Sequence, residues 1–163
     1  MNAKEALKIN LDMGEYISLG YLGDLTEQDL MHRPAQNANH IRWQLGHLIV
    51  SEHEMIEGCF PGSMPKLPEG FKAKYAKETA ASDKISDFHT KDQLMEAYKQ
   101  QRAATLKNLE KVSEADLSKA SPESMQSYAP TVGAALSMQG THWVMHAGQW
   151  AVIRRQLGRA PLF

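Results

Sequence analysis

The sequence predicts an all-α protein, a four-helix bundle in which one long connection joins the second and third helices. Apolar residues recur at helical spacing in four long segments, which is the pattern of amphipathic helices. No segment shows the sustained alternation, bounded by hairpin turns, that is typical of β-strands. Residues 60–88 fit neither pattern and contain several prolines and glycines, so we expect them to form the long connection.

The first two helices are predicted from their caps and their apolar spacing. The first covers about residues 3–22, with Asn2 as the N-cap. The second covers about residues 40–57, and Asn39 is expected to be its N-cap. Gly58 is expected to end this helix in a left-handed conformation.

The third and fourth helices have similar signals at their ends. The third is expected over residues 91–112, where Thr90 and Gln93 form the pattern of a capping box. The fourth is expected over residues 132–157 and is followed by Gly158, a residue that favours a helix stop. At ~1.5 Å per residue this last helix is about 39 Å long.

Two short segments after the first and third helices resemble each other. Leu25–Leu30 and Val112–Leu117 each carry a hydroxyl residue, a glutamate, an aspartate and a leucine in the same order. This is the pattern of a capped helical turn. The repetition favours two similar halves, although such turns also recur by coincidence. Between the halves, Phe60–Phe88 is expected to be an ordered crossover or a lid beside the bundle.

Composition excludes several classes of protein. The chain has 163 residues, of which 42% are hydrophobic, so a single folded domain over residues 1–163 is expected. Its net charge of -1 gives no excess of positive charge for nucleic-acid binding. One cysteine, Cys59, excludes an intrachain disulfide. No apolar run is long enough for a membrane span and no signal peptide is evident, so a cytoplasmic location is expected.

Histidines are the chemically informative residues of the fourth predicted helix. His142 and His146 are four residues apart, so they share one face. Such a pair can supply two ligands to one metal ion, but core histidines with ordinary hydrogen bonds have the same spacing. Gln149 lies near the same face and could orient a ligand or bond to a buried backbone carbonyl. Gly140 and Gly148 bracket the pair and permit close approach of another helix or of a ligand.

The third ligand has to come from another helix, and periodicity leaves its identity open. His47 on the second helix is one candidate, although the apolar face of this helix is too broad to fix its direction. His53 is a competitor in a more polar stretch. Glu52 and Glu54 are general bases by residue type, but both are expected to be solvated on the helix surface. No catalytic residue can therefore be assigned.

These residues resemble the DinB/YfiT-like family of metal-binding four-helix bundles. The similarity lies in Trp43 and His47 on the second helix, with His142, His146 and Gln149 on the fourth. It also includes the segments Leu25–Leu30, Arg33-Pro34 and Gln156–Pro161.

The resemblance implies an up-down-down-up bundle that binds a divalent metal ion, zinc or nickel, through His47, His142 and His146. Family members have been assigned as metal-dependent hydrolases and as low-molecular-weight thiol transferases or isomerases. A small-molecule substrate, which includes the possibility of a thiol, is therefore expected. The resemblance also implies a homodimer, for which aromatic and methionine residues around Trp143, Trp150 and the segment Phe60–Phe88 could offer surface.

Two alternatives to an enzyme stay open at the level of the sequence. The first is a metal-binding bundle without turnover that acts as a sensor, a store or a stress-response interaction protein. The second is a plain helical interaction domain whose histidines are satisfied without metal. Cys59 lies just past the second helix and is expected to be a small buried hydrophobe and not a metal ligand.

Overall fold

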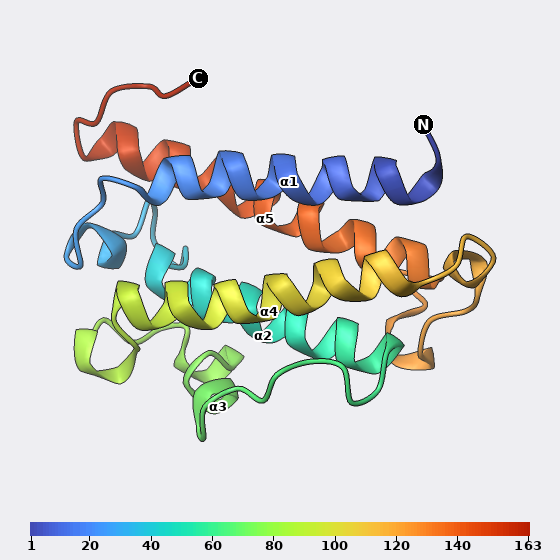
Figure 1. The fold of residues 1–163 in the computed structure, drawn as a ribbon. Helices are drawn as coiled ribbons and strands as arrows, with labels where there is room; N and C mark the ends of the chain where they lie inside the picture. The colour runs from blue at the N-terminus through green and yellow to red at the C-terminus, as the bar shows by residue number, and fades with distance from the viewer.

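The computed structural model describes all 163 residues and contains helices but no β-strand (Figure 1). Four long helices form the body of the molecule and a short fifth one lies in the crossover. The helices are α1 (Ala3–Leu22), α2 (Ile41–Cys59), α3 (Phe71–Lys74), α4 (Lys91–Lys111) and α5 (Val132–Gln156). Five one-turn 3₁₀ helices occupy the connections at Asp29–Met31, Lys77–Thr79, Ile85–Asp87, Asp116–Ser118 and Glu123–Met125.

The long helices run up, down, down and up, as the resemblance implied. In Figure 1, α1 and α5 run in one direction and α2 and α4 in the other. The most extensive helix contact joins α1 to α5, and α2 contacts both α4 and α5. Because α2 and α4 are parallel, the chain has to return along the bundle between them, and the crossover with α3 makes this return (Figure 1). The predicted bundle with one long crossover is confirmed.

Most of the predicted caps are also confirmed. Asn2 and Thr90 both form complete capping boxes, in which the side chain of the residue three positions into the helix bonds back to the cap. The hydroxyl of Thr131 accepts from the backbone N–H of Ala134 at 3.1 Å at the start of α5. Gly158 follows α5 with a φ of 72°, the left-handed conformation expected of a helix stop.

Both predicted ends of α2 were wrong by one or two residues. His40, and not Asn39, is the N-cap, because its Nδ1 accepts from the backbone N–H of Trp43 at 3.0 Å. At the other end the helix passes through Gly58 and stops at Cys59. The following Phe60 has a φ of -134°, since Pro61 disfavours a helical conformation in the residue before it.

The two similar turns adopt the same structure. In the first, the backbone N–H of Asp29 donates to the hydroxyl of Thr26 at 3.2 Å. In the second, the backbone N–H of Asp116 donates to the hydroxyl of Ser113 at 3.1 Å. Each turn then forms a one-turn 3₁₀ helix. The repeated sequence pattern therefore produces a repeated turn at the same place in each half of the bundle.

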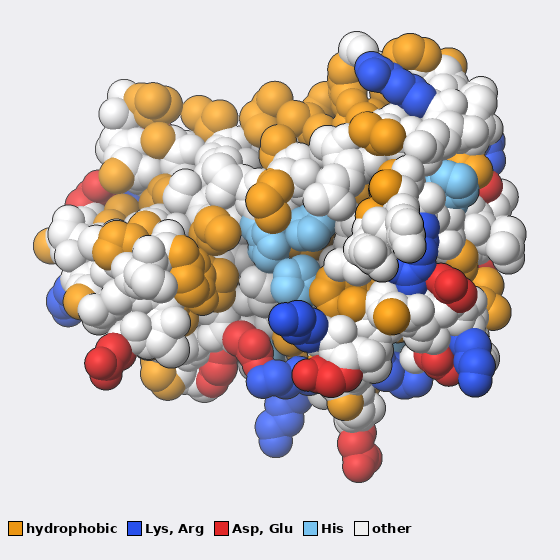
Figure 2. Space-filling model, turned by 180° about the vertical axis from the view of Figure 1, so that it is seen from behind, with side chains coloured by type: hydrophobic (Ala, Val, Ile, Leu, Met, Phe, Trp, Pro, Cys, Tyr) orange, Lys and Arg blue, Asp and Glu red, His pale blue; other side chains and the backbone are white.

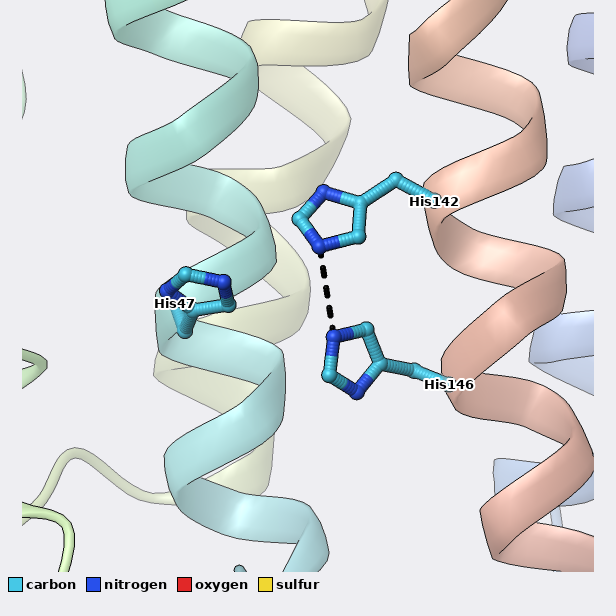
Figure 3. A group of neighbouring side chains, drawn as sticks. All are labelled: His47, His142 and His146. Carbon is cyan, nitrogen blue, oxygen red and sulfur yellow. Dashed lines mark hydrogen bonds between the residues drawn. The ribbon is translucent and has the colours of Figure 1, made fainter. Parts of the chain in front are cut away.

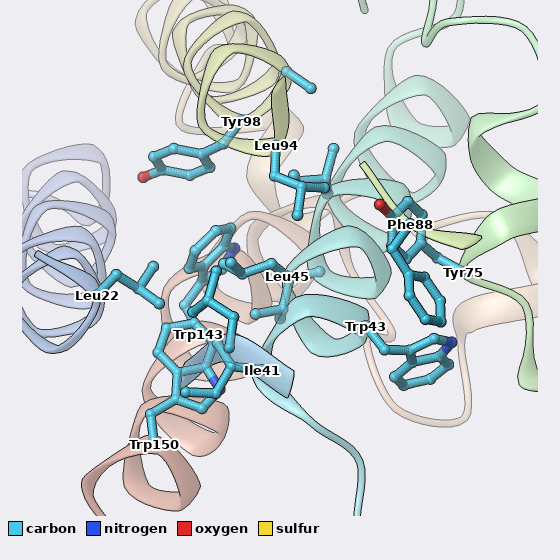
Figure 4. Packing of buried hydrophobic residues seen from close by; sticks show 14 of the residues in the cluster. Leu22, Ile41, Trp43, Leu45, Tyr75, Phe88, Leu94, Tyr98, Trp143 and Trp150 are labelled. Atoms are coloured by element: carbon cyan, nitrogen blue, oxygen red, sulfur yellow. The ribbon is translucent and has the colours of Figure 1, made fainter. Parts of the chain in front are cut away.

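The main apolar cluster combines residues of the four long helices and of the crossover (Figure 4). Trp143 is 1% exposed and Trp150 is 0% exposed, so both belong to the core. They therefore offer no surface for pairing, and this part of the argument for a homodimer was wrong. The homodimer itself stays a prediction. No helix combines the length and the apolar character that crossing a membrane would require.

The crossover is an ordered part of this core. Phe71, Tyr75 and Phe88 are buried, and they pack in the same cluster as the helix residues (Figure 4). Tyr75 lies so close to α2 that a Cβ added to Gly46 would be 2.1 Å from its ring. Glycine at this position therefore lets the crossover approach the α2 backbone, one residue before His47.

Candidate metal centre

The three predicted ligands lie together between α2 and α5 (Figure 3). His47 projects from α2, and His142 and His146 project from successive turns of α5. One potential ligand atom from each side chain lies within 4.8 Å of the other two. The Nε2 atoms of His142 and His146 are 3.3 Å apart. This group of imidazoles could hold a metal ion.

The remaining histidines are occupied elsewhere. Nδ1 of His53, the competing candidate, is 3.0 Å from the amide oxygen of Gln101 on α4. His40 caps α2, and His89 is hydrogen-bonded to the Tyr75 hydroxyl at 3.0 Å. His32 is 2.9 Å from the side chain of Gln156. Of the two candidates that helical periodicity left open, the structure therefore places His47, and not His53, beside His142 and His146.

The ring of His47 is oriented by Trp43, one helical turn earlier on α2. The two rings are stacked, with centroids 5.0 Å apart and an angle of 5° between their planes. The indole N–H of Trp43 lies 3.2 Å from the carbonyl oxygen of Ala76 and 3.1 Å from the hydroxyl of Thr79. Both partners belong to the crossover, so this segment helps to fix the direction in which His47 points.

Gln44 is a residue of the site that the sequence analysis missed. It is 0% exposed, and its Oε1 lies 3.0 Å from Nδ1 of His146. The same oxygen accepts from the indole N–H of Trp150 at 2.7 Å. The available signal was an uncharged polar residue inside the mostly apolar segment 41–50, where a buried carboxamide needs partners.

Burial keeps the three imidazoles neutral at pH 7. Desolvation lowers the pKa of His47. It also lowers the pKa of His142 to about 4, and repulsion from His47 adds to this effect. The pKa of His146 is lowered to about 3 by burial and by the two neighbouring imidazoles. Neutral imidazole is the form that binds metal ions.

The acidic residues near the site have different roles from those expected. Glu52 was predicted to be solvated, yet it is 0% exposed. Its two carboxylate oxygens accept from Nε and Nη2 of Arg102, both at 2.9 Å, and one also accepts from the hydroxyl of Thr105. This ion pair directs Glu52 into the bundle. Glu54 is partly exposed, as predicted, and pairs with Lys72 of the crossover.

Gln149 and Cys59 complete the predicted residues. The side chain of Gln149 is exposed, and its Oε1 accepts from Nε2 of Gln44 at 2.9 Å. Gln149 is thus bonded to another carboxamide, and not to the buried backbone carbonyl that the sequence analysis gave as one of its possible partners. Cys59 packs at the edge of a separate apolar cluster, and burial raises the pKa of its thiol. It is therefore a half-buried residue at the edge of the core, and not the fully buried one that was expected.

A cavity of about 1310 Å³ opens beside His47. Its walls come from α2, from the crossover and from the loop before α5, so the crossover lies beside the histidines and not on the far side of the bundle. In Figure 2, histidine side chains reach the surface near the centre of the face shown. The charged residues of the wall include Glu54, Glu57, Lys66 and Lys72, and the apolar ones include Val50, Met55, Leu67, Phe71 and Met125.

The fold and the site define an all-α bundle protein with a three-histidine cluster at the edge of a cavity. The chain matches the family model of the DinB superfamily over residues 11–150, and it belongs to this superfamily. The match covers most of the bundle and includes His47, His142 and His146. Neither a curated protein nor a solved structure was found to be similar to the chain.

Proposed function

We propose that this protein is a metal-dependent enzyme that acts on a small molecule, with a divalent ion bound by His47, His142 and His146. The observation that carries the proposal is the convergence of one ligand atom from each imidazole within 4.8 Å, beside a cavity. Three neutral ligands fit a divalent cation, because imidazole is a good ligand for zinc and nickel. We propose zinc or nickel as the resident ion.

The residues around the cluster have separable roles in this proposal. A metal ion with three histidine ligands retains its double charge and an open position, so it can lower the pKa of a bound water or bind a substrate thiolate. Trp43 and the crossover hold His47 in place. The cavity wall binds the substrate. Glu52 is held by Arg102, so it is unavailable as a general base.

Two reaction classes are compatible with this arrangement, namely hydrolysis and transfer of a low-molecular-weight thiol. Both require that one substrate atom reaches the open position of the metal. The alternative is a metal-binding bundle without turnover, which acts as a sensor or a store. We favour an enzyme, because the cavity lined by His47 offers room for a small molecule.

The first experiment tests the metal site. Purified wild-type protein, His142→Ala and His53→Ala are titrated with zinc in competition with a chromophoric chelator. His53 is the matched control, because it lines the same cavity but is paired with Gln101. We expect one zinc ion per chain in the wild type and in His53→Ala, with strongly reduced affinity in His142→Ala. Equal affinities in the wild type and in His142→Ala would refute the assignment.

The second experiment tests turnover. The zinc- and nickel-loaded proteins are assayed for conjugation of small thiols to an electrophile and for hydrolysis of ester and amide substrates. Activity on one panel that disappears on chelation and returns with metal supports an enzyme and identifies its class. A metal-loaded protein that is inactive on both panels supports the sensor or store.

A further inference from the structure

We infer that Gln44 is a positioning residue of the metal site, whose carboxamide fixes the tautomer of His146. In this tautomer the proton is on Nδ1, and the lone pair of Nε2 faces the other histidines. The inference rests on the proposed function in one respect, namely that this Nε2 lone pair is the one offered to the metal. The tautomer itself can be measured in the metal-free protein.

Two hydrogen-bond partners fix the orientation of the Gln44 amide, because one of them can only donate and the other can only accept. The indole N–H of Trp150 can only donate, and it lies 2.7 Å from Oε1 of Gln44. The backbone carbonyl of Asn39 can only accept, and it lies 2.7 Å from Nε2 of Gln44. Rotation of the amide by 180° would place donor against donor and acceptor against acceptor. The oxygen of the amide is therefore the atom that faces His146.

This orientation determines the protonation of His146. Oε1 of Gln44 carries no proton, so the contact of 3.0 Å with Nδ1 of His146 requires an N–H on that nitrogen. A neutral imidazole carries one proton, which leaves Nε2 as an acceptor. That Nε2 lies 3.3 Å from Nε2 of His142, on the side of the ring where the three histidines meet (Figure 3).

Burial protects the hydrogen bonds of the Gln44 side chain from competition with water. Gln44 is 0% exposed, so water has no access that would replace its carboxamide. The second N–H of its amide donates to Oε1 of Gln149 at 2.9 Å. The oxygen therefore accepts two hydrogen bonds and the nitrogen donates two, which uses the full capacity of the amide. Gln149 contributes to this arrangement because it holds the amide of Gln44 from the surface of the bundle.

The test measures the tautomer and the metal affinity separately. Long-range ¹H–¹⁵N NMR spectra of the metal-free protein report which ring nitrogen of His146 is protonated, and competition titration reports the affinity for zinc. The variant is Gln44→Leu, which removes the acceptor. Gln139→Leu is the matched control, since Gln139 is also a buried carboxamide but bonds to Ala135 on its own helix.

We expect the Nδ1–H tautomer of His146 in the wild type and in Gln139→Leu. In Gln44→Leu a population with the proton on Nε2 should appear, and zinc affinity should fall about 10- to 100-fold, the usual effect of losing such a partner.

Several results would overturn the inference. An Nε2–H tautomer of His146 in the wild type would do so without any variant, even if Gln44→Leu fails to fold. Unchanged zinc affinity in a folded Gln44→Leu protein would overturn the positioning role while the proposed metal site stands. Failure of the wild type to bind either zinc or nickel would overturn the proposed function, and with it the role of Gln44 toward the metal.

Discussion

Glu52 and Glu54 are two residues apart on α2, yet one is in the interior and the other on the wall of the cavity. The guanidinium of Arg102 donates two hydrogen bonds to the Glu52 carboxylate, and both side chains are almost completely buried. Glu54 instead forms an ion pair with Lys72 that is open to water. A buried charge that loses its partner is costly, whereas an exposed pair contributes little.

These two environments predict different effects of the same substitution. Glu52→Gln should lower the free energy of unfolding by about 3 kcal/mol, because Arg102 would lose its only buried counter-charge. Glu54→Gln is the control and should cost less than about 1 kcal/mol. Urea unfolding of both variants provides the comparison. Effects of similar size would show that the buried ion pair does not contribute in this way.

At the scale of the helices, the contact between α1 and α5 depends on glycine. A Cβ added to Gly140 would lie 2.5 Å from the backbone oxygen of Asn10 on α1. The same addition at Gly148, two turns further along α5, would meet nothing within 4 Å. Of the two glycines that bracket the histidine pair, Gly140 therefore serves the close helix packing that the sequence predicted, and Gly148 does not.

We expect Gly140→Ala and Gly148→Ala to have effects of opposite sign on stability. Gly140→Ala should cost about 1–3 kcal/mol, because the backbones of α1 and α5 would have to separate. Gly148→Ala should stabilise the protein by up to about 1 kcal/mol, since alanine favours a helix more than glycine does. Thermal and urea unfolding measure both. A Gly140→Ala protein as stable as the wild type would contradict the close contact.

The N-cap of α2 predicts a pH dependence of stability. His40 caps the helix through the lone pair of Nδ1, and burial lowers the pKa of its imidazole below the ordinary value of about 6.5. His40 therefore takes up a proton near pH 6.5 in the unfolded chain, whereas in the folded protein it does so only at a lower pH. This contribution to stability is complete above about pH 6.5 and is lost as the pH falls toward the lowered pKa.

Replacement of this cap by a residue that does not titrate should reduce the dependence. In His40→Asn, which keeps a capping side chain, the loss of stability between pH 7 and pH 5 should be shallower than in the wild type by up to about 1.4 kcal/mol per pH unit. Urea unfolding at several pH values in the presence of a chelator gives both slopes. Equal slopes would mean that His40 does not contribute to the dependence.

For the molecule as a whole, the features that could be predicted from the sequence are those that depend on residues close to one another along the chain. The four long helices, the capping boxes and the pair His142 and His146 follow from local spacing. The burial of Glu52 could not be predicted, because its partner Arg102 is 50 residues away on another helix. The role of Gln44 depends in the same way on His146, 102 residues further along.

The crossover illustrates the same limit at a larger scale. Its length and prolines predicted an ordered crossover or a lid beside the bundle, and the structure shows an ordered crossover that lines the cavity with His47. Its core contacts were not predictable from composition, since Tyr75 is buried only because Gly46 leaves room for it on α2. The segment therefore both stabilises the bundle and, through Trp43, orients a ligand histidine.

The most direct test of the central claim is an anomalous difference map at the zinc absorption edge from crystals of the zinc-loaded wild-type protein. The proposed function predicts one strong peak per chain, about 2.0–2.1 Å from one nitrogen of each of His47, His142 and His146. A peak held by other residues, or no peak at the three histidines in a fully loaded crystal, would contradict it.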